Sequence, residues 1–140
     1  MTWRVLVVDD EEEVRKVLRL HLTKEGYEVI EAADGKQAIQ KVREGDNPLR
    51  LNAIICDIRM PVISGTEAID YFRREFPSIP IVVLTGFIDV QLAVDLMKKG
   101  VTDYLVKPVP KEQLIAAVHK ALGVKKPGGE RGQQSVLPGA

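Results

Sequence analysis

Short apolar runs alternate along the chain with stretches whose apolar residues recur every three or four positions. The runs are too short for helices and are bounded by polar or turn residues, so they predict strands at 5–8, 27–32, 53–56, 79–84 and 104–106. The helical spacing between the strands predicts five helices, within 14–22, 38–42, 69–72, 90–97 and 114–122. The candidate helix N-caps are Asp34, Ser64 or Thr66, and Asp89.

Five strand and helix units in succession predict an α/β protein with a parallel sheet, because a tight turn cannot join two parallel strands. Right-handed crossovers would then place helices on both faces of the sheet. The strands agree with this arrangement, since continuous apolar strands are typical of sheets buried on both faces. We therefore expect one doubly wound domain over residues 1–122.

The composition narrows the classes of function. The 20 lysines and arginines balance the 20 aspartates and glutamates, so no overall field favours nucleic acid or an anionic membrane. We expect neither direct nucleic-acid binding nor membrane contact. The single Cys56 permits no internal disulfide and no cysteine-based zinc site. The run of four apolar residues at 5–8 is far shorter than the core of a signal peptide, so we expect a cytoplasmic protein.

The composition changes at Gly123. The last 18 residues contain five of the eleven glycines and two of the eight prolines. We expect residues 123–140 to form a flexible tail or linker.

Polar side chains follow four of the five predicted strands. Asp9 and Asp10 follow the first strand, Asp57 the third, Thr85 the fourth and Lys107 the fifth. Ligands of open α/β sheets bind outside the carboxyl ends of the strands. The sequence therefore predicts that these five side chains meet at one edge of the sheet.

Each of these residues also has an ordinary structural explanation. Asp10 with Glu13 fits a helix capping box, although this leaves Asp9 unexplained. Strand termination, β propensity and surface charge are the corresponding explanations for Asp57, Thr85 and Lys107. Their predicted meeting at one edge favours a joint chemical role.

A cation must accompany three carboxylates that converge. At about 4 Å each pair repels by roughly 1 kcal/mol in water and about 4 kcal/mol at an effective dielectric constant of 20. A few oxygen ligands suit Mg²⁺, which keeps several waters and shares its site with phosphate. A hydroxyl and an ammonium group nearby would complete a cradle for a phosphoryl group, and carboxylates can accept one covalently.

Four motifs carry a family resemblance over about residues 3–122. They are VLVVDDE from residue 5, IICDIRMP from residue 54 with Gly65, VLTG from residue 83, and DYLVKP from residue 103. In this order at these strand ends, they resemble the receiver domain of two-component response regulators. The resemblance implies a flavodoxin-like fold with five strands in the order 2-1-3-4-5 and five helices.

The same resemblance implies roles for individual residues. It makes Asp57 the phosphoacceptor and a metal ligand beside the Mg²⁺ carboxylates Asp9 and Asp10. It adds the backbone carbonyl of Arg59 to the metal ligands. It makes Thr85 and Lys107 the residues that bind the phosphoryl group. Tyr104 would be a rotamer switch that acts with Thr85. The peptide bond between Lys107 and Pro108 would be cis.

The resulting hypothesis is a phosphoacceptor that is not a turnover enzyme. It would take a phosphoryl group from a histidine kinase or phosphotransfer protein in a Mg²⁺-dependent reaction, and would switch conformation to control a downstream protein or output domain.

One alternative is a phosphorylation-independent binding module on the same fold. Another is an aspartate-nucleophile phosphatase of the haloacid dehalogenase type, which needs a second aspartate where this chain has Arg59. A flavin site is disfavoured because the loop 9–13 is acidic and would repel phosphate.

Overall fold

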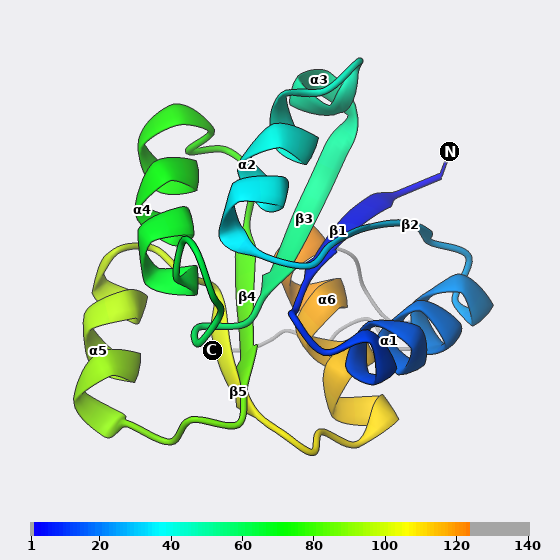
Figure 1. Cartoon of the computed structure of the whole chain (residues 1–140). Coiled ribbons are helices and arrows are strands. Elements are labelled where there is room, and N and C mark those ends of the chain that lie inside the picture. Colours follow the sequence, from blue (N-terminus) through cyan, green and yellow to red (C-terminus); the bar gives the residue numbers. More distant parts are fainter. Residues whose placement is uncertain (1, 124–140) are drawn as a thin grey trace.

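The computed structural model describes residues 2–123, and they contain one five-stranded parallel sheet. The strands lie in the order β2-β1-β3-β4-β5, as predicted (Figure 1). Their bounds are β1 Arg4–Val8, β2 Glu28–Ala32, β3 Leu51–Cys56, β4 Ile81–Thr85 and β5 Asp103–Val106. The flavodoxin-like sheet topology is therefore confirmed.

Residues 2–123 contain six helices, of which the sixth follows the last strand and the others lie between strands. They are α1 Glu12–Lys24, α2 Gly35–Arg43, α3 Asn47–Arg50, α4 Gly65–Glu75, α5 Val90–Lys98 and α6 Lys111–Leu122. The five predicted helices are confirmed as α1, α2, α4, α5 and α6, and the structure adds α3, which the prediction missed. A helix of four residues is too short to display the 3.6-residue period from which the other helices were predicted.

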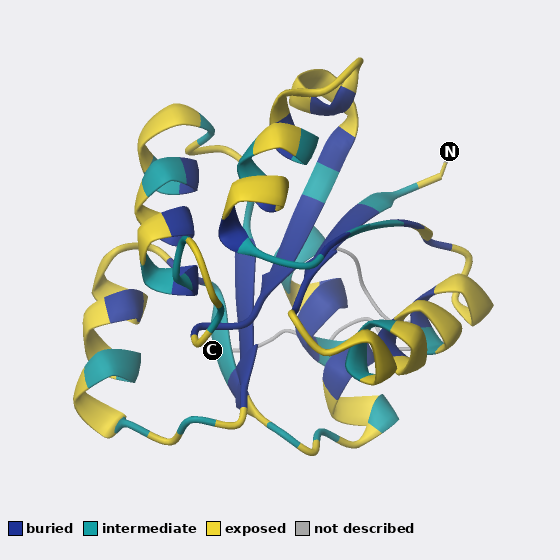
Figure 2. Ribbon diagram, in the orientation of Figure 1, coloured by how far each residue is buried: buried dark blue, intermediate teal, exposed yellow. Residues whose placement is uncertain are grey.

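The helices cover both faces of the sheet (Figure 1). Leu6 and Val8 of β1 join the core beneath α2, α4 and α5, whereas Val5 and Val7 join the core beneath α1 and α6. This division follows from the alternation of side chains along a strand. Figure 2 shows the sheet buried between exposed outer helix surfaces. The buried sheet consequently sets the positions of the loops at its edges.

Three predicted N-caps are confirmed. The side chains of Asp34, Ser64 and Asp89 accept backbone hydrogen bonds at the starts of α2, α4 and α5. The Asp10 capping box is wrong, since Glu11 is the N-cap of α1 and no side chain caps this helix. Oδ1 of Asp9 instead accepts a hydrogen bond of 2.8 Å from the Glu11 backbone N–H. Asp10 is thus free of any capping role.

Two further sequence predictions concern the ends of the chain and the membrane. Within residues 2–123, no helix combines the length and apolar character needed to cross a membrane. Gly123 ends α6 in the left-handed conformation, with φ of 71°. The predicted flexible tail lies otherwise outside the described residues.

Candidate functional site

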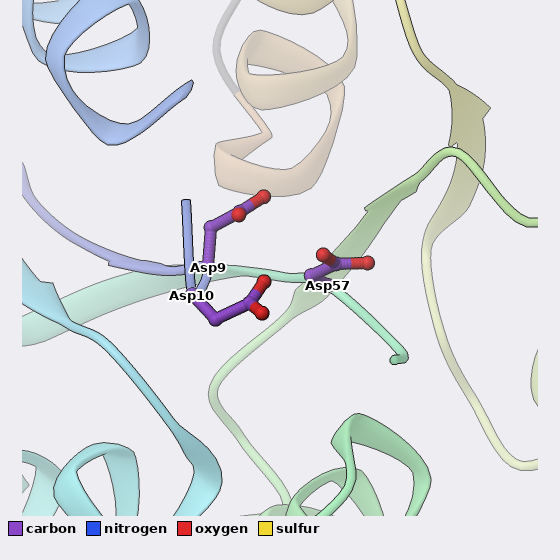
Figure 3. A group of neighbouring side chains, drawn as sticks. All are labelled: Asp9, Asp10 and Asp57. Atoms are coloured by element: carbon purple, nitrogen blue, oxygen red, sulfur yellow. The ribbon is translucent and has the colours of Figure 1, made fainter. Parts of the chain in front are cut away.

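Three carboxylates meet at the carboxyl ends of β1 and β3. The side chains of Asp9, Asp10 and Asp57 each offer an oxygen, and these oxygens lie within 4.8 Å of one another (Figure 3). The sheet brings them together, because Val8 is paired with Cys56 and the Asp57 N–H donates to the Val8 carbonyl at 2.9 Å. Asp9 and Asp57 are buried, whereas Asp10 is exposed.

Lys107 is the cation that faces this acid cluster. Its Nζ lies 2.7 Å from Oδ2 of Asp9, 3.2 Å from Oδ2 of Asp57 and 3.2 Å from Oε1 of Glu11. Only 17% of its side chain is exposed, so surface charge does not explain this residue. The peptide bond between Lys107 and Pro108 is cis.

The acid cluster and the lysine alter each other's ionisation. Burial by itself lowers the pKa of Lys107, but the hydrogen bond to Asp9 and the charges of Asp57 and Asp9 outweigh it, and the pKa is raised overall. Burial raises the pKa of Asp9, despite the opposing hydrogen bonds from Lys107 and the Glu11 amide. The effect of burial on Asp9 therefore exceeds the stabilisation that its hydrogen bonds give to the charged form.

The two carboxylate oxygens of Asp57 have different partners, a backbone N–H and the Lys107 ammonium group. Oδ1 accepts a hydrogen bond of 2.7 Å from the Ile58 backbone N–H, whereas Oδ2 faces Lys107. Asp57 is only 5% exposed but lines a cleft of about 380 Å³. The other residues that line this cleft are Asp10, Glu11, Arg59, Thr85, Gly86, Phe87 and Lys107.

Thr85 and Tyr104 both bind the loop that follows β4. Oγ1 of the buried Thr85 accepts a hydrogen bond of 3.1 Å from the Phe87 backbone N–H. The Tyr104 hydroxyl, from β5, donates to the Phe87 carbonyl at 2.7 Å. Burial and the nearby charge of Asp89 raise the pKa of Tyr104, so this hydroxyl stays a donor at neutral pH.

The side chain of Arg59 packs on the ring of Phe87, and both residues line the cleft. Its Cζ lies 3.5 Å from the centroid of the Phe87 ring, which is a cation–π contact. Arg59 follows β3 and Phe87 follows β4, so the contact joins the loops of two neighbouring strands.

The structure brings together all the residues predicted to meet at one edge, and it adds three that the sequence did not single out for the site. Glu11 pairs with Lys107, although its sequence position indicates only a helix start. Nη1 of Arg15 donates to the Asp9 carbonyl at 2.7 Å, and Nε of Arg15 donates to Oε1 of Glu31 at 3.0 Å. Arg15 follows Glu11 by one turn of the first helix, but nothing in the sequence distinguishes it from the other charged residues of that helix.

The curated proteins that are similar to this chain include proteins named as transcriptional regulators. YrkP of Bacillus subtilis, a transcriptional regulatory protein, is 38% identical over 118 residues, which are 84% of this chain and 48% of that protein. The transcriptional regulatory protein ZraR of Escherichia coli is 36% identical over 84% of this chain and 26% of its own length. The chain thus spans about half of YrkP and a quarter of ZraR.

A complex of CheX with CheY, BeF3 and Mg²⁺ from Borrelia burgdorferi contains a similar fold. The TM-score is 0.81 at 27% identity, over 88% of this chain and 90% of that chain. A profile of the response regulator receiver domain matches residues 5–119. Because this match covers most of the chain and agrees with the sheet order, the chain belongs to the response regulator receiver domain family.

Proposed function

We propose that the chain accepts a phosphoryl group on Asp57 and passes this signal on through a change of conformation. The main observation behind the proposal is the surroundings of Asp57, which lines a cleft. The carboxylates of Asp9 and Asp10 lie beside it, and Oδ2 of Asp57 is 3.2 Å from the ammonium group of Lys107. Such a site offers a nucleophilic oxygen beside groups that can bind a phosphoryl group.

The proposed donor is a phosphohistidine of a histidine kinase or phosphotransfer protein. Oδ2 of Asp57 attacks the phosphorus atom, the new O–P bond forms, and the P–N bond breaks with its electron pair left on the imidazole nitrogen. The Ile58 N–H holds the other carboxylate oxygen in place. Lys107, 3.2 Å from the attacking oxygen, supplies positive charge where the incoming phosphoryl oxygens gather.

The donor set of the acid cluster fits Mg²⁺. Asp9, Asp10 and Asp57 would hold the ion, together with the backbone carbonyl of Arg59 that the family resemblance implies. The geometry supports the fit, because one oxygen from each of the three carboxylates lies within 4.8 Å of the others and oxygen ligands suit Mg²⁺. When bound, Mg²⁺ would neutralise charge on the phosphoryl oxygens during transfer.

Thr85 and Lys107 would then bind phosphoryl oxygens, and Tyr104 would change rotamer. Two hydrogen bonds to a charged group contribute about 1.5 to 3 kcal/mol each, and moving an equilibrium from 1:99 to 99:1 takes about 5.5 kcal/mol. The two bonds are therefore close to sufficient for the switch if they form only in the active state.

The partner that receives the signal is a downstream protein or an output domain. Transcriptional regulators among the relatives support an output of this kind, while the balanced charge of this chain supports no direct contact with nucleic acid. We propose a cytoplasmic phosphoacceptor that is consumed and regenerated, not a turnover enzyme. A phosphatase of the haloacid dehalogenase type is disfavoured, because it needs a second aspartate two residues after Asp57, where this chain has Arg59.

Intact-mass measurement after incubation with acetyl phosphate and Mg²⁺ tests the proposal. We expect one added phosphoryl group on the wild-type chain and on Asp70→Asn, a control that changes an exposed aspartate of α4. We expect none on Asp57→Asn, and none on the wild type in EDTA. Persistent single phosphorylation of Asp57→Asn, or full activity in EDTA, contradicts the proposal. A wild-type chain that stays unmodified supports the binding module instead.

A further inference from the structure

Phe87 contacts Thr85, Tyr104 and Arg59 through three different groups. Its N–H donates to Oγ1 of Thr85, its carbonyl accepts from the Tyr104 hydroxyl, and its ring carries the Arg59 guanidinium. Thr85 and Arg59 both line the cleft of Asp57, whereas Tyr104 does not. Phe87 therefore connects the cleft with Tyr104 by two separate contacts, one through its backbone and one through its ring.

We propose that Arg59 and Phe87 form a second relay, which carries the charge change at Asp57 to Tyr104 in parallel with Thr85. This inference rests on the proposed function, because it describes how phosphorylation of Asp57 is transmitted. It assigns the Arg59 side chain and the Phe87 ring as positioning groups for Tyr104.

The electrostatics of the cleft provide the driving force. A phosphoryl group brings about −1.5 to −2 of charge at neutral pH, in place of the single charge of the Asp57 carboxylate. Arg59 is exposed and lines the same cleft, so its guanidinium has room to turn toward phosphoryl oxygens. A charge-assisted hydrogen bond to a phosphoryl oxygen is stronger than a cation–π contact at an exposed site. Phosphorylation thus favours departure of Arg59 from the ring.

The loss of this contact changes the loop that holds Tyr104. With Arg59 in place, the Phe87 residue is fixed at its ring, its N–H and its carbonyl. Departure of Arg59 frees the ring, and movement of Thr85 toward the phosphoryl group weakens the hold on the N–H. Both changes lead to the same result, a weaker hydrogen bond between the Phe87 carbonyl and the Tyr104 hydroxyl. Tyr104 is then free to change rotamer.

NMR of ring-labelled tyrosine measures this relay directly. The chain has three tyrosines, at 27, 71 and 104, so the signals can be assigned by substitution. We use beryllofluoride with Mg²⁺ as the phosphoryl mimic, and the Ile58 amide, next to Asp57, reports when the site is saturated. At saturation we expect Arg59→Gln and Thr85→Ala each to lose about half of the wild-type Tyr104 shift, and the double variant to lose nearly all of it.

Arg74→Gln is the matched control. Its guanidinium lies 5.6 Å from the Tyr71 ring centroid on α4, so the substitution removes a similar contact away from the cleft. The control should keep the full Tyr104 shift. A second variant, Phe87→Leu, keeps an apolar side chain but removes the π face, and should match Arg59→Gln.

The outcomes separate the relay from the proposed function. A full Tyr104 shift in Arg59→Gln at saturation overturns the relay and leaves the phosphoacceptor intact. A loss of shift equal in Arg74→Gln and Arg59→Gln also overturns it. Absence of phosphorylation on wild-type Asp57, measured by intact mass, overturns both.

Discussion

Nζ of Lys107 lies 2.7 Å from Oδ2 of Asp9, at the centre of a cluster of carboxylates that also suits a divalent cation. The lysine and the proposed metal ion would consequently share Asp9 and Asp57 as partners. The ammonium group partly neutralises the acid cluster, and it would repel a divalent cation that enters beside it. The affinity for Mg²⁺ would then depend on a residue that does not ligate the ion.

We predict that Lys107→Met binds Mg²⁺ more tightly than the wild type. Two unit charges at about 4 Å interact by roughly 1 kcal/mol in water and more at a buried site, so the dissociation constant should fall about fivefold or more. Calorimetric titration with Mg²⁺ measures it. Lys99→Met, which changes an exposed partner of Asp70, is the control and should leave the affinity unchanged. An unchanged or weaker affinity in Lys107→Met contradicts the prediction.

Gly65, at the start of α4, permits the backbone of Asp57 to take its position. A Cβ atom at Gly65 would lie 1.8 Å from the Asp57 carbonyl oxygen and 2.6 Å from Cα of Ile58. We predict that Gly65→Ala lowers the free energy of unfolding by more than about 2 kcal/mol, because the loop after β3 must shift. Denaturant titration measures the loss. Gly86→Ala is the control, since a Cβ atom there meets nothing within 4 Å. Equal stability of the two variants would count against this account.

The sequence was sufficient to predict the sheet and the residues at its edge. Buried strands such as β3 contain a continuous apolar run, here at 53–56, and the residues after the strands face the same edge by the rules of parallel sheets. Side-chain caps such as Asp34 were also predictable, because the interaction is local in sequence. Local pattern and topology together therefore explain most of the site.

Contacts that depend on tertiary packing or on backbone groups were not predictable. The pairing of Arg15 with Glu31 joins α1 to β2, and neither residue belongs to an apolar pattern. The role of Phe87 depends on its N–H and carbonyl, which every residue except proline possesses. The four residues of α3 are too few to show the 3.6-residue spacing of apolar positions that indicates a helix. These features follow from the packed structure and leave no distinct signal in the chain.

Arg59 and Phe87 both line the cleft of Asp57, so each of these bulky side chains would restrict the access of water to a phosphoaspartate. We predict that the double substitution Arg59→Ala and Phe87→Ala shortens the phosphoaspartate half-life, about fivefold for each 1 kcal/mol removed from the barrier. Decay of the phosphorylated species, followed by intact mass, measures the half-life. Arg74→Ala should decay like the wild type, since Arg74 lies away from the cleft. An unchanged decay rate in the double variant contradicts the prediction.

Glu31 at β2 should make the stability of the chain depend on pH. Burial alone raises its pKa, but hydrogen bonds from Arg19 and Arg15 outweigh burial and lower the pKa overall. A carboxyl whose pKa is lower in the folded state stabilises the fold above its unfolded pKa, about 4.3, and loses this contribution as the pH falls through the folded value. We predict that Glu31→Gln costs about 1 kcal/mol of the free energy of unfolding at neutral pH and much less below about pH 4. Denaturant titrations at both pH values measure the difference.

Glu44→Gln is the control, because its exposed pair with Lys41, at 3.8 Å, should contribute little at either pH. If Glu31→Gln lowered the free energy of unfolding equally at both pH values, the contribution of Glu31 would come from packing and not from its charge.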